Sequence, residues 1–156
     1  MKDFDQAFAA VIGVEGGCSN DPRDPGGETK YGISKNAYPN LNIGDLTLTQ
    51  AQAIYRKGYW DRCQCDALPW PLSLYVFDSA VNQGAITAIR HLQAALGVTV
   101  DGILGPTTLQ RAGQADAEHA DLFLAERALG YMSSSLFSTY GRGWLKRLFV
   151  IARSVA

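Results

Sequence analysis

Residues 15–33 have the sequence EGGCSNDPRDPGGETKYGI. Glycine and proline occur here among Asn, Asp and Thr at a density that no helix tolerates, so we expect an irregular loop or a small hairpin. A helix is predicted over residues 2–14, because apolar side chains recur there at helical spacing and the Gly16–Gly17 pair then stops the pattern. The sequence therefore predicts a helical body with a small polar lobe directly after the first helix.

The remainder of the chain has the periodicity of further helices, most of them amphipathic. We predict helices over residues 72–82, 85–96, 106–112, 116–136 and 141–153, and one that begins near Thr47 and ends near Tyr59. Thr49 is the candidate N-cap of that last helix, and Gly84 and Gly97 end the two central ones. Two prolines interrupt the chain between residues 64 and 71. The expected fold is α+β and mostly α-helical.

Length and composition exclude several classes of protein. The chain of 156 residues is one domain's worth, and its 47% hydrophobic and 19% charged residues are typical of a globular protein. Fourteen Lys and Arg against fifteen Asp and Glu give a net charge of −1, without the basic stripe that nucleic-acid binding requires. The longest apolar runs are far shorter than the roughly 20 residues that cross a bilayer. We expect a monomer that neither binds nucleic acid nor inserts into a membrane.

The cysteines and histidines do not form a metal-binding pattern. Cys63 and Cys65 are too close for a usual structural disulfide and Cys18 makes their number odd, so we expect free thiols in a protein made in the cytoplasm. His91 and His119 lack the spacing of paired zinc ligands. We therefore expect no metal and no organic cofactor. The first residues, MKDFD, are acidic where a Sec-type signal is cationic, which predicts synthesis without such a signal.

Glu15 is a carboxylate in an unusual position. It follows Phe8 by seven residues, Val11 by four and Ile12 by three, which places it on the apolar stripe of the first helix. Loss of water and the negative end of the helix dipole both raise the pKa of a carboxyl group at such a place. A group of this kind is able to donate a proton near neutral pH. The alternative is an ion pair with Arg or Lys, or a cap on the amides of the following loop.

The loop after Glu15 supplies partners for an acid. Asp24 follows Glu15 by nine residues and Thr29 by fourteen, on a glycine-rich segment that can fold back across the helix end. Cleavage of a glycosidic bond needs an acid for the leaving oxygen and a second polar or acidic group that holds water or stabilises the positively charged sugar ring. Glu28 is an alternative second carboxylate that spacing does not exclude.

Residues 15–33 resemble the signature of glycoside hydrolase family 108, the N-acetylmuramidases of bacteriophage lysis cassettes and some bacterial secretion loci. The resemblance implies a lysozyme-like fold and makes Glu15, which opens the motif, the general acid. Asp24 and Thr29 resemble an Asp and a Thr of more distant phage-type lysozymes. By that likeness Asp24 positions water or stabilises charge on the ring, and Thr29 orients the water or Asp24. Cys18 stands where the family usually has an aromatic residue, which bears on affinity rather than reaction type.

Later segments extend the resemblance as far as residue 112. Residues 59–60, 68–69 and 77–84 look like the second block of the family, and residues 92–108 resemble the small helical peptidoglycan-binding unit that commonly follows. The layout that the resemblance implies is a single lysozyme-like domain, 1–156, in three parts: the signature region 1–84, the peptidoglycan-binding-like unit 85–112 and the C-terminal helices 113–156.

Five further residues are candidates for contact with a sugar. Tyr31, Trp60 and Trp144 have rings that offer an apolar face and a polar tip to a pyranose. Asn82 and Gln83 come at the end of the apolar helix, where their amides would face a cleft. The alternatives are core packing for the rings and capping or loop hydrogen bonds for the amides.

Chemistry and resemblance together predict a lysozyme that hydrolyses the β-1,4 bond between N-acetylmuramic acid and N-acetylglucosamine in peptidoglycan. The separation of its carboxylates would decide between retention and inversion. The biological setting implied is a phage or prophage endolysin, made in the cytoplasm and acting in the periplasm or on the wall after release through a holin-type lesion or a secretion route. Two alternatives are a non-catalytic wall-binding module that uses residues 85–112 and a structural component of a phage or secretion apparatus.

Overall fold

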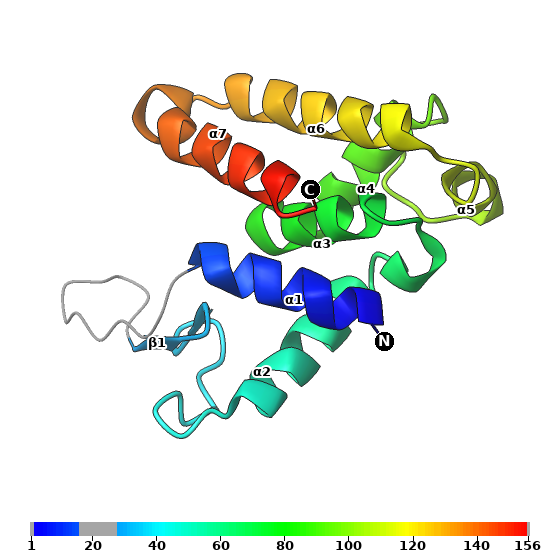
Figure 1. Cartoon of the computed structure of the whole chain (residues 1–156). Coiled ribbons are helices and arrows are strands. Elements are labelled where there is room, and N and C mark those ends of the chain that lie inside the picture. The colour runs from blue at the N-terminus through cyan, green and yellow to red at the C-terminus, as the bar shows by residue number, and fades with distance from the viewer. Residues whose placement is uncertain (1, 16–27, 156) are drawn as a thin grey trace.

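The computed structural model describes residues 2–15 and 28–155 of the chain. The described part is mostly helical with one two-stranded sheet, which confirms the predicted α+β class (Figure 1). Its helices and strands are α1 Lys2–Glu15, β1 Thr29–Lys30, β2 Ile33–Ser34, α2 Leu48–Tyr55, α3 Leu72–Gln83, α4 Ala85–Ala95, α5 Pro106–Ala112, α6 Ala117–Met132 and α7 Phe137–Arg153. None of these helices is long and apolar enough to span a membrane.

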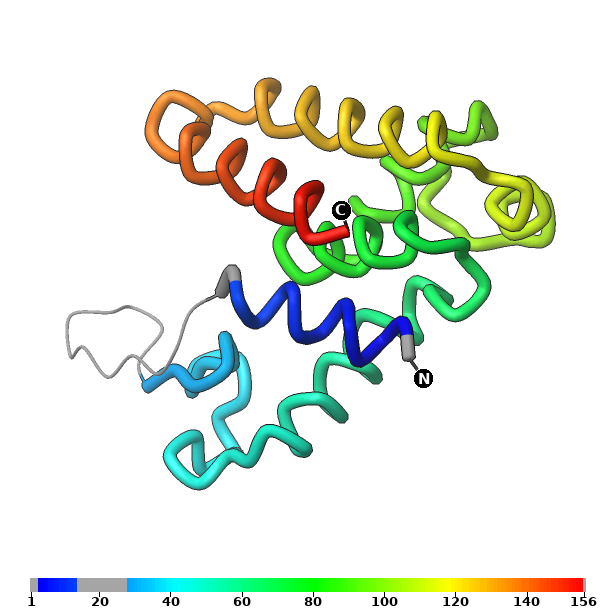
Figure 2. Tube along the Cα trace, in the orientation of Figure 1, coloured from blue at the N-terminus to red at the C-terminus, as the bar shows by residue number. Residues whose placement is uncertain are grey.

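Helix α3 is the centre of the fold. Its residues 72–80 are all buried, as expected for a helix that is apolar on every side. Helix α1 packs on one side of it, whereas α4, α6 and α7 cover the others. Figure 2 follows the chain from α1 through the lobe and α2 into α3, and on through α4, α5 and α6 to α7. Because α7 packs against both α1 and α3, the last helix of the chain closes over the first.

An aromatic cluster joins α1 to α3. The rings of Phe4 and Phe77 each meet Trp60 edge to face, at centroid distances of 5.3 and 5.4 Å. Phe8 packs in the same way on Tyr55, at 5.4 Å. Such pairs contribute about 0.5–1.5 kcal/mol each beyond the area that they bury. The cluster therefore fixes the N-terminal helix on the body, and with it the place where α1 ends.

The small lobe contains a tight hairpin. Strands β1 and β2 are antiparallel and pair Lys30 with Ile33. The two residues between them, Tyr31 and Gly32, both have positive φ, 53° and 75°. Two consecutive residues of positive φ are typical of the type I′ turn, whose twist matches that of the strands it joins. Tyr55 donates a hydrogen bond from its hydroxyl to the Tyr31 carbonyl (3.0 Å), which ties the hairpin to α2.

Two helix boundaries differ from the predicted ones near α2. The N-cap is Thr47 rather than Thr49, because Thr47 Oγ1 accepts from the Gln50 amide (3.2 Å) while the Gln50 side chain accepts from the Thr47 amide (2.8 Å). This reciprocal capping box satisfies two amide groups, which a cap two residues later would leave open. The helix then passes into a π-helical turn, Arg56–Trp60, instead of continuing to Tyr59 as an α-helix.

The hairpin of α6 and α7 also departs from prediction. Helix α6 ends at Met132 rather than at 136, and α7 begins at Phe137 rather than at 141. Gly141 therefore lies inside the helix. A β-carbon added there would come within 2.6 Å of the Phe137 ring, so glycine is required by packing rather than by a turn.

The side chain of Gln93 organises the segment formed by residues 92–108. Its buried side chain donates from Nε2 to Asp101 Oδ1 (2.7 Å) and to the Ile103 carbonyl (3.0 Å). Its Oε1 accepts from the amide of Gly102 (2.8 Å), whose φ of 81° suits glycine. One buried amide on α4 thus holds the loop before α5 in place.

His91 on α4 is held in an environment that disfavours its charged form. Its ring meets Phe123 edge to face at 6.2 Å, and its Nδ1 is buried without a hydrogen-bond partner among the described residues. A β-carbon added at Gly130 of α6 would come within 2.8 Å of His91 Nε2. Burial, helped by the charge of Arg127, lowers the pKa of His91 to about 4.

We expect the stability of the protein to decrease as the pH falls from about 6.5 to about 4. In that window the unfolded chain binds a proton at His91 while the folded chain does not, so acid favours unfolding. Urea unfolding of wild type and His91→Leu at pH 7 and pH 5 measures this, and the variant should lose less stability between the two. His119→Gln, which keeps a capping side chain at the start of α6, should retain the wild-type difference. An equal acid response in wild type and His91→Leu would contradict the prediction.

Candidate functional site

A buried ion-pair cluster holds the C-terminal half of α3 to α6 and α7. Asp78 Oδ2 lies 2.6 Å from Nη1 of Arg127, and Asp78 Oδ1 lies 2.6 Å from Nη2 and 3.0 Å from Nε of Arg147. Asp78 and Arg127 are completely buried and the Arg147 side chain is 10% exposed. Charge-assisted hydrogen bonds of this kind are the strong ones, and they fix three helices relative to one another.

The cluster extends to the last residues of α3. Arg127 Nε donates to Gln83 Oε1 (2.9 Å), and the Tyr131 hydroxyl donates to Asn82 Oδ1 (2.6 Å). Burial raises the pKa of the Tyr131 hydroxyl, which therefore keeps the proton that it donates. The Tyr131 ring stacks on Trp144 of α7, with centroids 5.2 Å apart and planes at 24°. Both amides and the indole are thus held by the same set of contacts.

These side chains surround an open pocket of about 370 Å³, which we call the Trp144 pocket. It is lined by Asn82, Gln83, Thr87, Gly130, Tyr131, Ser134, Leu136 and Trp144. Aromatic surface beside a few placed amides and hydroxyls is the composition that binds a sugar ring. The structure therefore brings together three of the five residues predicted to contact substrate: Asn82, Gln83 and Trp144.

The amides of the Trp144 pocket have their acceptor oxygens occupied. Arg127 and Tyr131 donate to these oxygens, as described above, and Ser79 Oγ also donates to Gln83 Oε1 (3.2 Å). No described residue accepts a hydrogen bond from Nδ2 of Asn82 or Nε2 of Gln83. These two amide nitrogens are therefore among the donors that the pocket offers.

A second pocket, of about 300 Å³, lies between α1 and α7, and we call it the α1–α7 pocket. It is lined by Gly13, Gly143, Lys146, Arg147 and Val150. Gly13 stands two residues before the end of α1. Arg147 belongs to this pocket and to the ion-pair cluster, and Gly143 is the neighbour of Trp144 in the chain. One short stretch of α7 therefore contributes to both pockets.

The predicted catalytic residues belong to the end of α1 and the lobe. Glu15 is the last residue of α1, and its side chain is outside the described parts of the structure. Asp24 lies outside the described residues, as does Cys18. Thr29 is half-buried in β1, opposite Ser34. Glu28, the alternative second carboxylate, is directed at the loop before α2, because a β-carbon on Gly44 would lie 3.1 Å from its Oε1.

The prediction that Trp60 contacts substrate is wrong. Trp60 is fully buried in the aromatic cluster, and its Nε1 donates to Asp66 Oδ1 (2.9 Å), so no ring face is left for a sugar. The π-helical turn at the end of α2 accompanies this inward placement. Tyr31 remains half-buried in the hairpin turn and lines neither pocket.

Sequence reasoning missed Arg127, Tyr131 and Arg147. One signal was present: Asp78 interrupts an otherwise apolar helix, and a buried carboxylate needs cationic partners. Cys63 and Cys65 are free and buried, and burial raises the pKa of the Cys65 thiol. In residues 2–15 and 28–155 no group of three or more His, Cys, Asp or Glu side chains is placed to hold a metal ion.

Comparisons with known proteins agree on one family. The family model described as glycosyl hydrolase 108 matches residues 8–84. Brucella abortus SagA, a protein of solved structure, is 32% identical, with a TM-score of 0.81 over 97% of this chain and 92% of that one. No curated protein matches significantly. The likeness confirms the lysozyme-like α+β fold and the family resemblance, whereas the division into three parts and the peptidoglycan-binding-like unit stay predictions.

We expect Asp78→Asn to destabilise the protein by about 3–5 kcal/mol, because removing one partner of a buried ion pair leaves uncompensated buried charge. The free energy of unfolding in urea measures the loss. Asp121→Asn, which removes an exposed carboxylate from α6, is the matched control and should change stability by less than about 0.5 kcal/mol. Equal stability of the two variants would show that the cluster does not hold the helices together.

Proposed function

Because the chain belongs to glycosyl hydrolase family 108, and is therefore a glycoside hydrolase, we propose that it cleaves the β-1,4 bond between N-acetylmuramic acid and N-acetylglucosamine in peptidoglycan. The observation that carries this proposal is an open pocket beside the end of α1, with the Trp144 pocket next to it along α7. Glu15, the proposed general acid, ends α1 two residues after Gly13, which lines the nearer pocket. The other pocket, the Trp144 pocket, contains the Trp144 ring and the amide donors of Asn82 and Gln83.

The Trp144 pocket is suited to one sugar of the glycan strand. The indole of Trp144, which stacks on Tyr131 and lies 5.9 Å from the Tyr140 ring, gives the pocket an aromatic wall against which the C–H groups of a pyranose can pack. The free amide nitrogens of Asn82 and Gln83 are donors for the carbonyl oxygen of an N-acetyl group or for ring hydroxyls. N-acetylated sugars, which carry both features, are the substrate units that this chemistry favours.

The proposed reaction begins at Glu15. Its carboxyl group donates a proton to the glycosidic oxygen as the bond to the sugar carbon breaks, and the departing sugar leaves as an alcohol. Asp24 positions the attacking water or stabilises the positive charge on the ring, and Thr29 orients the water or Asp24. The position of Glu15 at the C-terminal end of a helix supports the role of acid, because the helix dipole there disfavours a negative charge.

The setting that we propose is a phage or prophage endolysin, made in the cytoplasm and acting on the cell wall after its release. Its support is the resemblance of residues 15–33 to the muramidases of phage lysis cassettes. In this setting peptidoglycan strands are the partner of the enzyme.

We expect Glu15→Gln to lower the rate of peptidoglycan hydrolysis by roughly 10²- to 10⁴-fold, the usual contribution of a general acid. Products from purified peptidoglycan are reduced with borohydride and identified by mass spectrometry. Reduced muramic acid ends should form with wild type and be lost with the variant, while both proteins unfold at the same urea concentration. Asp24→Asn should also be impaired, and Glu28→Gln should retain activity. Reduced glucosamine ends, cleaved peptides or an active Glu15→Gln would refute the assignment.

We expect Trp144→Ala to raise KM for glycan strands roughly tenfold with little change in kcat, because stacking on a ring contributes to binding and not to proton transfer. Trp144→Phe, which keeps a ring at this position, should recover most of the loss. Initial rates over a range of glycan concentrations separate the two constants. A fall in kcat at unchanged KM, or no change in either constant, would contradict a role of Trp144 in binding the ground-state substrate.

A further inference from the structure

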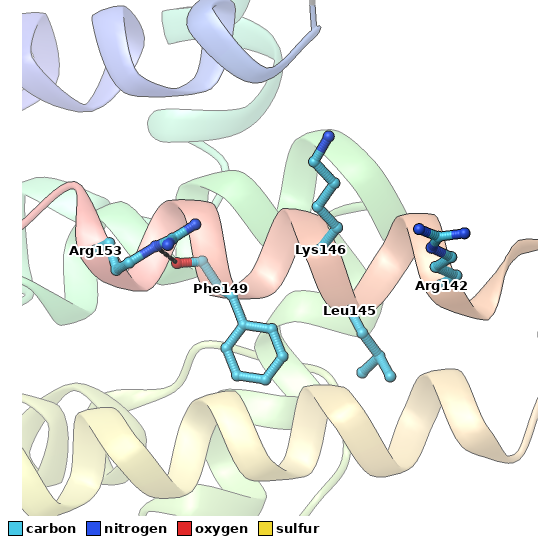
Figure 3. Close-up of a pocket in the computed structure, with 5 residues that line it drawn as sticks. All are labelled: Arg142, Leu145, Lys146, Phe149 and Arg153. Carbon is cyan, nitrogen blue, oxygen red and sulfur yellow. Dashed lines mark hydrogen bonds between the residues drawn. The ribbon is translucent and has the colours of Figure 1, made fainter.

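Helix α7 presents an exposed face next to the pockets. Leu145 and Phe149 are four residues apart, and Arg142, Lys146 and Arg153 are four and seven apart, so the two sets form neighbouring stripes along the helix. They line an open hollow of about 650 Å³, shown in Figure 3. We call it the α7 groove and define it by Arg142, Leu145, Lys146, Phe149 and Arg153.

The α7 groove combines an apolar floor with a cationic rim. Phe149, 62% exposed, and Leu145 point toward α6 (Figure 3). Three cations line the hollow with them, and among the described residues no acidic side chain does so. Arg153 Nε donates to the Phe149 carbonyl (3.3 Å), which holds this guanidinium against the backbone of α7. In a chain whose net charge is −1, the groove is a local concentration of positive charge.

The α7 groove adjoins the α1–α7 pocket. Lys146 lines both, and in Figure 3 its side chain extends toward α1 while Phe149 extends the other way. A ligand held in the α1–α7 pocket would therefore reach the groove by extending past Lys146. This adjacency is the reason to expect that the groove receives a part of the molecule that binds in the pockets.

We propose that the α7 groove binds the stem peptide that N-acetylmuramic acid carries in peptidoglycan. This inference rests on the proposed hydrolysis of that polymer. The stem peptide is a short acidic peptide in which free carboxylates accompany alanine methyl groups. Its carboxylates are complementary to Arg142, Lys146 and Arg153, and its methyl groups to Phe149 and Leu145. An anionic membrane would match the charge of the groove, but not its position next to a pocket between two helices.

The test compares two soluble substrates, uncross-linked peptidoglycan chains and the same chains after an amidase has removed their peptides. Arg142→Gln/Arg153→Gln should lower kcat/KM for the peptide-bearing chains roughly fivefold, mainly through KM, since exposed charge contacts are weak. It should leave the peptide-free chains unaffected. The preference of the wild type for peptide-bearing chains should also decrease as salt is added, because exposed charges are screened.

The matched control is Lys57→Gln/Arg111→Gln, which removes two exposed cations elsewhere on the molecule. It should behave as wild type on both substrates. An equal effect of Arg142→Gln/Arg153→Gln on both substrates, or no effect on either, would overturn the proposal. The proposal would also be overturned if Arg142→Gln/Arg153→Gln alone lost binding to phosphatidylglycerol vesicles without a change in substrate preference. That result would identify a membrane as the occupant of the groove.

The failure of the proposed function is recognised separately. If wild type hydrolyses neither substrate, the muramidase assignment fails. Calorimetric titration with a disaccharide that carries a tetrapeptide, and with the same disaccharide without it, then reports on the α7 groove alone. Tighter binding of the peptide-bearing ligand, lost in Arg142→Gln/Arg153→Gln, would support the groove, and equal binding of both ligands would overturn it.

Discussion

The carboxylate of Asp78, buried between the guanidinium groups of Arg127 and Arg147, sets the geometry of the site. Its bonds connect α3 with α6 and α7, three helices whose apolar contacts alone would allow small shifts along their axes. A buried ion pair is costly to desolvate and tolerates little displacement, so it specifies position more than it adds stability. Because Arg127 and Arg147 also reach the lining of the two pockets, the same constraint holds the helix ends where a glycan is proposed to bind.

This arrangement prepares the Trp144 pocket before any ligand arrives. Asn82 and Gln83 have their acceptor oxygens engaged by Tyr131 and Arg127, which fixes the orientation of both amide groups at the pocket. Trp144 is likewise held by stacking on Tyr131. Groups on helices that are locked by neighbouring contacts lose little conformational entropy on binding. On the other side of α1, the bond from Tyr55 to the hairpin carbonyl connects the small lobe to the body.

Apolar periodicity predicted the helices well where local pattern and tertiary packing agree. Helix α5 has the predicted bounds, and α1 and α3 differ by one residue at their ends. The predictions that were wrong concern residues whose positions are set by tertiary packing. The last helix was predicted to begin only at Gly141, because the role of this glycine, making room for the Phe137 ring, is invisible in a linear pattern. Trp60 was predicted to contact substrate, whereas it is buried at the end of a π-helical turn. Such a turn has no recognisable sequence pattern, so the inward position of the ring could not be predicted. The pocket residues Asn82, Gln83 and Trp144 were predictable by residue type. The arginines of the ion-pair cluster were not, because a buried Asp78 indicates that cationic partners are needed but does not indicate which Arg or Lys residues they are.

The two functions proposed for helix α7 differ in physical kind and lie on neighbouring faces. The face with Gly143 and Arg147 is anchored to α3 and borders the α1–α7 pocket, next to the Trp144 pocket, whose uncharged amides and ring are proposed to bind an N-acetylated sugar. Such contacts discriminate weakly between a bare strand and one that bears peptides. The exposed face with Arg142, Phe149 and Arg153 adds interactions that only a peptide-bearing strand can use. Because these contacts are the same in the bound substrate and the transition state, they act on KM and selectivity and leave the proton transfer at the end of α1 unchanged.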